Sequence, residues 1–464
     1  MINIELNDLT CIMSFNNDNE KKIIKKFITY DDTSNCFMRG RYRPERKKAV
    51  CLGKEIQDYL VTFVGLAKEI LLECKKNNIK IKEIKDNRTH FDFQEKEWTY
   101  DELRSFFPKE FNYVDHQVRA LEAMIKTNTG IIVAATSAGK SSIIKAYMKL
   151  TNLPTLILVD RATLGKQLKD DITEYGLDCG FCGDGKIIPG YNMVSTIQSV
   201  KKVPNMTSYK CVLIDESHRS SSATFQDFLK QFGCPLKFGF TASPYNGDYL
   251  KYAMIRQFIG SPLVKIEATE LMENGVMAKA KIKLVKNSCE DTFDYPSAYD
   301  LNITHGKLRN QKIADIVSMY NDGVAILVRT LDHGEELEKI IPGAVFIRGE
   351  TSLNERMKII KKFNEGEIKV LIGSSILNEG ISISNMKVLI MASSGKAISQ
   401  TIQKIGRVLR ITKEKKEGIF YDFIDVGNRF LEKQSKKRIS IYKKEGYNDI
   451  RILDEKLEEI NTNK

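Results

Sequence analysis

The chain has 464 residues, of which 42% are hydrophobic and 28% charged, and it carries a formal net charge of +12. This composition excludes a disordered or collagen-like chain, and the absence of any run of about 18 apolar residues argues against a membrane span. The positive net charge favours a polyanionic partner, of which nucleic acid is the first candidate. A lysine-rich surface that only keeps the protein soluble would give the same net charge.

The N-terminus and the cysteines favour a reducing, cytoplasmic location, which would be the host cytoplasm if the protein is viral. No basic segment followed by an apolar core comes after Met1, so we expect no secretory signal. The nine cysteines are scattered singly, which fits free thiols better than a disulfide framework. Cys179 and Cys182 have C-x-x-C spacing, but two further zinc ligands are not found nearby, so we expect them to be structural.

Residues 1–98 are predicted to form a small N-terminal α/β domain that binds nucleic acid. Strands are expected at Ile2–Leu6 and Ile79–Ile84, and helices at Asn19–Phe27 and about Thr62–Lys76. The stretch between them, Phe37–Lys48, interleaves aromatic residues with cations that include Arg39, Arg41 and Arg43. Cations suit phosphates and aromatic faces suit bases, so we expect DNA contacts here. A solvated, charged hairpin is the alternative interpretation.

Residues 99–265 alternate apolar strand patterns with helix patterns, which predicts a parallel α/β sheet. The expected strands are Gly130–Ala135, Thr155–Val159, Tyr191–Val194, Cys211–Ile214 and Lys237–Phe240. The expected helices include Leu164–Tyr175 and Ala223–Phe232.

The first of these strands ends in a small-residue loop, after which a helix pattern begins. The loop and helix start consist of Thr136, Ser137, Ala138, Gly139, Lys140, Ser141 and Ser142. Backbone N–H groups at a strand end and a helix N-terminus point to one place, where a phosphate chain fits. Lys140 can reach the β- and γ-phosphates, and the Ser141 hydroxyl can hold Mg²⁺. Ala134 replaces the first glycine of the pattern, and an ordinary strand-to-helix turn is the alternative.

A second strand of the same sheet, Cys211–Ile214, runs into the acids Asp215 and Glu216. Asp215 can hold Mg²⁺ through water, and Glu216 can orient and deprotonate an attacking water molecule. An acidic pair that caps the next helix is the alternative. In a parallel sheet, however, this pair and the Lys140 loop lie at the same crevice outside the strand ends.

Residues 266–427 repeat the α/β pattern without a Gly-Lys-Ser loop, and residues 428–464 are predicted to form a charged helical tail. Strands are expected at Val324–Val328, Ala344–Ile347, Val370–Ile372, Val388–Met391 and Gly418–Tyr421. Helices are expected at Glu335–Ile341, Leu353–Phe363 and Ile398–Ile405, after a connection through about Ile266–Leu301. Arg407 and Arg410 would share a helix face, from which two guanidiniums could stabilise charge on a transferring phosphate. A basic helix on a basic protein is the alternative.

These motifs, in their order and spacing from Phe111 to Asp425, resemble those of superfamily 2 helicases. Gln117 is similar to the adenine-reading Q motif, and Asp215–His218 is similar to a DExH motif. The resemblance implies two tandem RecA-like domains that share ATP and Mg²⁺, with Gly380 at the nucleotide. It implies coupling roles for His218, Thr241, Ser243 and Gln403. It also implies nucleic-acid contacts for Arg161, Thr163, Thr196, Gln198, Thr330, Ser374 and Ser375.

Within that superfamily, three stretches are most similar to the UvsW-like branched-DNA helicases of bacteriophages: Thr136–Ser141, Gly239–Ser243 and Ile402–Arg410. The resemblance implies a DNA-stimulated ATPase that remodels replication forks and recombination intermediates, binds single-stranded and branched DNA, and acts as a monomer away from membranes. Three alternatives stay open: a duplex-DNA translocase that does not separate strands, an RNA helicase, and a nucleic-acid-binding module without catalysis.

Overall fold

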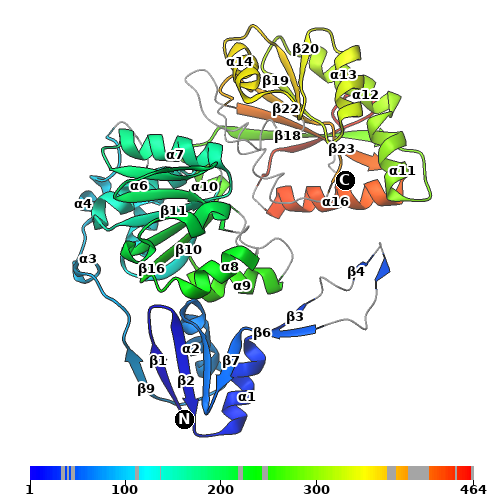
Figure 1. Ribbon diagram of the computed structural model, residues 1–464. Coiled ribbons are helices and arrows are strands. Elements are labelled where there is room, and N and C mark those ends of the chain that lie inside the picture. The colour runs from blue at the N-terminus through cyan, green and yellow to red at the C-terminus, as the bar shows by residue number, and fades with distance from the viewer. Residues whose placement is uncertain are drawn as a thin grey trace. The chain divides into compact units, whose positions relative to one another are not determined.

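The structure is a computed structural model, and it describes residues 1–32, 37–38, 41–42, 48–109, 114–135, 137–217, 223–242, 249–373, 383–395, 417–444 and 447–460. One compact unit comprises Met1–Ala134 and Gly139–Ile266, and the other consists mainly of Glu267–Lys464 (Figure 1). In the part of the chain so described, every helix is too short or too polar to cross a bilayer.

The first unit begins with a small sheet, in the strand order β7-β8-β2-β1-β9. Its strands are β1 (Ile2–Leu6), β2 (Thr10–Phe15), β7 (Gly53–Ile56), β8 (Tyr59–Phe63) and β9 (Ile81–Asp86), with helices α1 (Asp18–Phe27) and α2 (Ala67–Lys76). An arm formed by β3 (Thr29–Asp32) and β6 (Lys48–Cys51) extends from it, with the short strands β4 (Phe37–Met38) and β5 (Arg41–Tyr42) further along. The side chains of residues 37–48, and the whole of Arg39 and Arg43, lie outside the described residues.

The same unit continues into an eight-stranded sheet with the order β13-β12-β14-β11-β15-β16-β10-β17. Its strands are β10 (Thr129–Ala134), β11 (Thr155–Val159), β12 (Cys179–Gly183), β13 (Lys186–Ile188), β14 (Asn192–Thr196), β15 (Cys211–Asp215), β16 (Leu236–Thr241) and β17 (Pro262–Ile266). All neighbours pair in parallel except β12 with β13. The five predicted strands are therefore confirmed, with bounds that differ by at most two residues.

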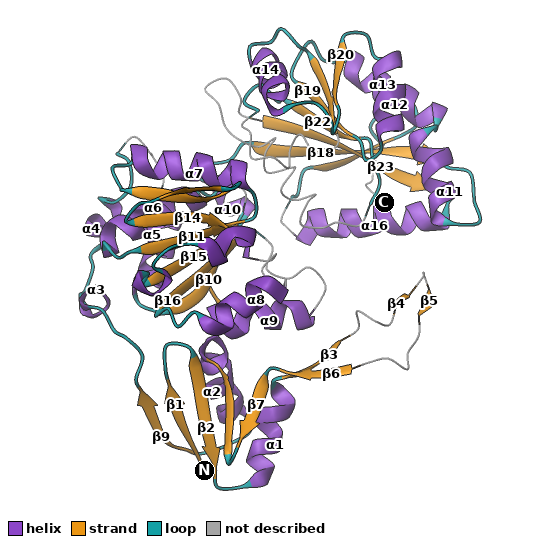
Figure 2. Cartoon of the chain, viewed as in Figure 1, coloured by secondary structure: helices purple, strands orange, loops and turns teal. Residues whose placement is uncertain are grey.

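Helices cover this sheet, as Figure 2 shows, and they explain why its strands are apolar on both faces. The helices are α3 (Asp92–Glu95), α4 (Tyr100–Arg104), α5 (Asp115–Ile125), α6 (Lys140–Thr151), α7 (Ala162–Glu174), α8 (Ala223–Gln231) and α9 (Tyr249–Ile259). Ile131 and Val133 of β10 pack with Phe225 and Phe258 of α8 and α9, whereas the intervening Ile132 faces the other layer and is equally buried.

The small N-terminal sheet and the large sheet are joined through α9. Leu250 and Ala253 of this helix complete the core of the small sheet. At the same contact the rings of Phe63 and Phe258 lie 4.4 Å apart. Glu69 of α2 accepts hydrogen bonds from Arg256 and Ser261, and the first of these is an ion pair. The N-terminal region is therefore packed onto the large sheet and shares a helix with it.

The second unit contains a seven-stranded sheet with the order β20-β21-β19-β22-β23-β18-β24. Its strands are β18 (Lys279–Ser288), β19 (Val324–Leu327), β20 (Ala344–Ile347), β21 (Val370–Gly373), β22 (Val388–Met391), β23 (Glu417–Val426) and β24 (Ile450–Leu453). Its helices include α10 (Ala268–Glu273), α11 (Tyr295–Tyr299), α12 (Lys307–Ser318), α13 (Leu331–Ile340), α14 (Leu353–Asn364) and α16 (Arg429–Lys444). The described strand pairs are all parallel, as predicted.

Three local predictions were wrong. The predicted helix from Thr62 begins only at Ala67, because Tyr59–Phe63 pairs with two strands and Thr62 donates to the Leu52 carbonyl. The connection through Ile266–Leu301 contains β18, which pairs with β23 along its whole length. Among the described residues of the tail, helix is found only in α16, and Ile450–Leu453 then forms an edge strand beside β18. The expected helix at Ile398–Ile405 lies outside the described residues.

His333 of α13 gives the second unit a pH-dependent stability. Its ring is fully buried, its Nε2 lies 2.9 Å from Asn310 Oδ1, and burial lowers its pKa to about 3. The unfolded chain therefore binds a proton between about pH 6.5 and pH 3 that the native state does not, so stability falls as the pH is lowered through that window. Between about pH 7.5 and pH 5, wild type should lose about 2 kcal/mol more than His333→Gln in urea unfolding. Equal losses would contradict this assignment.

Candidate nucleotide-binding site

The loop between β10 and α6 has the backbone geometry of an anion cradle. Ser137 and Gly139 have positive φ values, 72° and 76°, and Gly139 is the N-cap of α6. Left-handed residues of this kind turn successive N–H groups toward one point, and the helix N-terminus adds its positive dipole end. Ala138, which lies between these two residues in the loop, is fully buried.

Gln117, in the first turn of α5, lies against this loop. A Cβ atom at Gly139 would stand 2.1 Å from Gln117 Nε2, so Gln117 would have to shift, and the φ of 76° at Gly139 also favours glycine. Gln117 is 5% exposed, and its place in the nucleotide site stays a prediction. Ser141 and Ser142 follow in the first turn of α6, and Thr136 lies outside the described residues.

The acids at the end of β15 face the same loop. Lys140 Nζ lies 3.4 Å from Glu216 Oε1, and both side chains are partly buried. The Glu216 N–H donates to Asp215 Oδ1 over 3.0 Å, and Glu216 has a φ of 49°. A positive φ at a non-glycine residue costs free energy and is concentrated at functional sites. The fold thus brings Lys140 and Glu216, which are 76 positions apart in the sequence, into contact.

The sheet order explains this meeting. β16 lies between β10 and β15, and its last residue, Thr241, pairs in register with Val133. Thr241 is fully buried and stands between the Lys140 loop and the two acids. The coupling role of Thr241 stays a prediction.

The predicted nucleic-acid contacts of the first unit lie at the same edge of the sheet, beyond β11 and β14. Arg161 is the N-cap of α7, its side chain is 40% exposed, and Thr163 follows in the first turn. Gln198 is exposed just after β14. Thr196, by contrast, is 5% exposed, so its side chain is less accessible than the prediction requires.

The remaining predicted residues belong to the second unit or lie outside the described residues. Thr330 is the N-cap of α13, and its hydroxyl accepts from the His333 N–H. The predictions for the following residues fall outside the part of the chain that is described: His218, Ser243, Ser374, Ser375, Gly380, Gln403, Arg407 and Arg410. Cys179 and Cys182 are buried free thiols in β12, and burial raises the pKa of Cys179 to about 12.

Two family models match the chain in the order that the motifs predict. The model of the type III restriction enzyme res subunit matches residues 110–246, which include Lys140, Asp215 and Thr241. The model of the helicase conserved C-terminal domain matches residues 308–412.

Known proteins are similar over both units. The chain is 24% identical to the DNA 3'-5' translocase XPB2 of Sulfurisphaera tokodaii, over 68% of this chain and 81% of the relative. It is also 24% identical to the ATP-dependent DNA helicase UvsW of Enterobacteria phage T4, over 64% and 65%. A fragment of a type I restriction enzyme HsdR subunit from Vibrio vulnificus matches with a TM-score of 0.58 and 16% identity, over 85% of this chain and 75% of that one.

The chain is a superfamily 2 helicase related to the UvsW-like group. Its two parallel sheets are the two RecA-like domains of that superfamily, and it is an ATP-hydrolysing enzyme. The family resemblance that its motifs carried in the sequence is confirmed.

Sequence reasoning missed two features of this helicase's site. Ser217, 1% exposed, packs against Gly239 of β16, so the segment after Glu216 is held against the neighbouring strand. The positive φ of Glu216 could not be predicted either, because acids adopt that conformation rarely. The only signal in the sequence was a glycine within the apolar run of β16, which indicates close backbone approach.

Proposed function

We propose that this helicase uses ATP hydrolysis to unwind or remodel branched DNA, such as forks and recombination intermediates. The names of two relatives, a DNA translocase and a DNA helicase of a phage, support DNA as the substrate. The net charge of +12 and the cations of the N-terminal arm support a polyanionic partner.

The observation that carries the proposal is the 3.4 Å contact between Lys140 and Glu216 beside the anion cradle. An ammonium that reaches this carboxylate also reaches a γ-phosphate placed between the loop and β15. Lys140 then neutralises phosphate charge, and Glu216 orients and deprotonates the attacking water. Gln117 reads the adenine edge, and Arg407 and Arg410 are the predicted transition-state cations.

Ser141 and Asp215 fit Mg²⁺, because they offer a hydroxyl and a carboxylate, the hard oxygen ligands that this ion takes. Asp215 is the last residue of β15, and Ser141 is the second residue of α6, the helix that begins at the cradle. The ion would neutralise phosphate charge in the bound nucleotide. These residues hold it with one carboxylate, which matches the few protein ligands that Mg²⁺ uses beside phosphates.

The change that ATP hydrolysis causes at the nucleotide site is transmitted to the nucleic acid along one edge of the large sheet in the first unit. Thr241 stands between the two halves of the nucleotide site, and Arg161, Thr163 and Gln198 present polar side chains farther along the same edge. We propose that they contact the phosphates and sugars of one strand, with the helicase acting as a cytoplasmic monomer. Backbone contacts of this kind do not by themselves separate DNA from RNA.

One panel of measurements tests the function. ATP turnover by the full-length protein is measured with matched single-stranded DNA, duplex DNA, forked DNA, a four-way junction and RNA, beside Glu216→Gln as the inactive control. We expect forked DNA and the junction to stimulate turnover most, and about a hundredfold less turnover in the control. Stimulation by RNA alone would overturn the DNA assignment. Stimulation by duplex DNA without strand displacement would identify a translocase, and no turnover would identify a binding module.

A further inference from the structure

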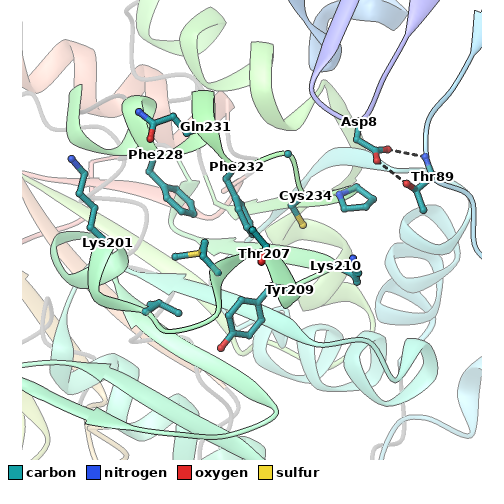
Figure 3. Close-up of a pocket in the computed structure, with 14 residues that line it drawn as sticks. Asp8, Thr89, Lys201, Thr207, Tyr209, Lys210, Phe228, Gln231, Phe232 and Cys234 are labelled. Atoms are coloured by element: carbon teal, nitrogen blue, oxygen red, sulfur yellow. Dashed lines mark hydrogen bonds between the residues drawn. The ribbon is translucent and has the colours of Figure 1, made fainter.

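A second cavity in the first unit lies away from the nucleotide site. It has a volume of about 620 Å³, within the range of about 300–1,000 Å³ typical of ligand pockets. Its walls come from the segment Lys201–Lys210, from the end of α8 through Pro235, and from Asp8 and Thr89 of the N-terminal region (Figure 3).

The direction of the strands separates this cavity from the ATP site. Lys210 and Pro235 immediately precede β15 and β16, so the cavity lies at the amino ends of these strands. Glu216 and Thr241 lie at the carboxyl ends of the same two strands. The two sites therefore occupy opposite edges of one sheet, and the mechanism of ATP hydrolysis gives the cavity no role.

The floor of the cavity is apolar. Tyr209, Phe228 and Phe232 line it and are 5%, 7% and 6% exposed, and the rings of Phe228 and Phe232 stack with centroids 5.0 Å apart. Cys234 lies beside them. All three rings are at most 7% exposed, so the floor accepts an apolar side chain but offers little ring face on which a base could stack.

The rim of the cavity is positively charged. Lys201 and Lys210 are exposed, line it, and lie on opposite sides of the two phenylalanine rings in Figure 3. Neither lysine forms an ion pair with another described residue. The one acid of the lining, Asp8, is engaged: its carboxylate accepts from the Thr89 N–H and hydroxyl over 2.8 and 2.7 Å.

A buried lysine fixes the position of the wall that carries Asp8. Lys237 Nζ donates to the Asp8 carbonyl over 2.5 Å, and the lysine is fully buried at the start of β16. Burial lowers the pKa of Lys237, and the carbonyl is its hydrogen-bond partner. The cavity is thus a preformed junction between the N-terminal region and the large sheet, which lowers the ordering cost of binding.

We propose that this cavity is a docking site for an acidic peptide segment of a partner protein, anchored by one or two large apolar side chains. The anchors fill the space above Phe228 and Phe232, and carboxylates on either side of them pair with Lys201 and Lys210. Charge complementarity selects an acidic partner, and it steers the encounter more than it adds affinity. Single-stranded nucleic acid fits less well, because the three rings are at most 7% exposed and only two described cations line the cavity.

The test uses the full-length protein and an array of hexapeptides. In each peptide the two central positions vary among Leu, Ile, Met, Phe and Trp. The two residues on each side of them are acidic in the first set of peptides, Ser in the second set and Lys in the third. The best acidic peptide is then labelled for fluorescence polarisation with wild type, Lys201→Glu, Lys210→Glu and the matched control Lys202→Glu. Lys202 is an exposed neighbour that does not line the cavity.

We expect the acidic set to bind best, and Ser in place of both anchors to abolish binding. Affinity should fall about tenfold in Lys201→Glu and in Lys210→Glu and stay unchanged in Lys202→Glu. The double variant K201E/K210E should bind the Lys-flanked set instead, with unchanged basal ATP turnover. Equal binding of the three sets, or equal losses in Lys202→Glu, would overturn the proposal. So would displacement of the peptide by an oligothymidylate whose own affinity falls in the same two variants.

Discussion

Replacing Lys140 with alanine is expected to lower ATP turnover about a thousandfold while leaving the fold unchanged. Lys140 is the first residue of α6, and its ammonium stands at the mouth of the cradle, 3.4 Å from Glu216. Alanine suits a helix start, so little stability is lost. The loss is expected in the chemical step, because Lys140 is the cation that would neutralise charge on the transferring phosphate. Steady-state turnover with and without forked DNA measures it, and thermal unfolding checks the fold.

A matched control lies on the same helix. Lys149, about two and a half turns further on, is exposed and lies over the ring of Tyr175, 5.1 Å from its centroid. Lys149→Ala removes the same side chain from α6 and should keep at least half of the wild-type turnover. Wild-type turnover in Lys140→Ala would disprove the assignment of the phosphate loop, whereas equal losses in both variants would point to a general effect on α6.

The parts of this helicase that the sequence predicted well are those where one physical requirement decides the outcome. Strands buried on both faces must be apolar throughout, so Thr155–Val159 and Val388–Met391 were predicted with their observed bounds. The phosphate loop was predictable because its glycine and lysine serve a geometry that few residues satisfy. Ala134, in place of the first glycine, ends β10, and the positive φ values occur at Ser137 and Gly139.

The parts that were missed depend on neighbours distant in the sequence. Lysines interrupt the pattern of Lys279–Ser288, and the segment is a strand because β23 and β24 pair with it on both sides. Ile450–Leu453 is likewise a strand only because β18 offers it an edge. The sharing of α9 between two cores could not be predicted either: the apolar residues Leu250 and Phe258 are typical of any buried helix, and only the fold assigns them to different cores.

That shared helix changes how the N-terminal region should be tested. Deleting residues 1–98 would expose Leu250, Ala253 and Phe258, and it would leave Arg256 without the carboxylate of Glu69. Removing one partner of a fully buried ion pair costs about 3–5 kcal/mol, and this partly buried pair would cost less. Together with the exposed apolar side chains, the deletion would destabilise the ATPase domain as well as removing its basic stretch. A smaller change is available in the arm, where Asp32 and Lys48 are directly opposed in the antiparallel pair β3–β6.

Replacing residues 33–47 by Asn-Gly closes this arm with a two-residue hairpin turn and removes five cations, Arg39, Arg41, Arg43, Arg46 and Lys47. We expect unfolding and basal ATP turnover to stay unchanged, because every described residue of the small sheet's core is kept. Fork affinity should fall more than about tenfold, and the slope of log affinity against log salt concentration should become shallower by up to about four. Fluorescence anisotropy with a labelled fork, measured over a series of salt concentrations, gives both quantities.

A second variant separates charge from length. Replacing the same five cations by serine keeps the arm at full length and removes its charge, so the salt slope should change as much as in the shortened arm. If the aromatic residues Phe37 and Tyr42 also stack on bases, the shortened arm should bind forks more weakly than the serine variant. Unchanged fork affinity in both variants would leave the arm without a role in DNA binding. It would instead place fork recognition on the edge of the large sheet, where Arg161 and Gln198 lie at the carboxyl ends of β11 and β14.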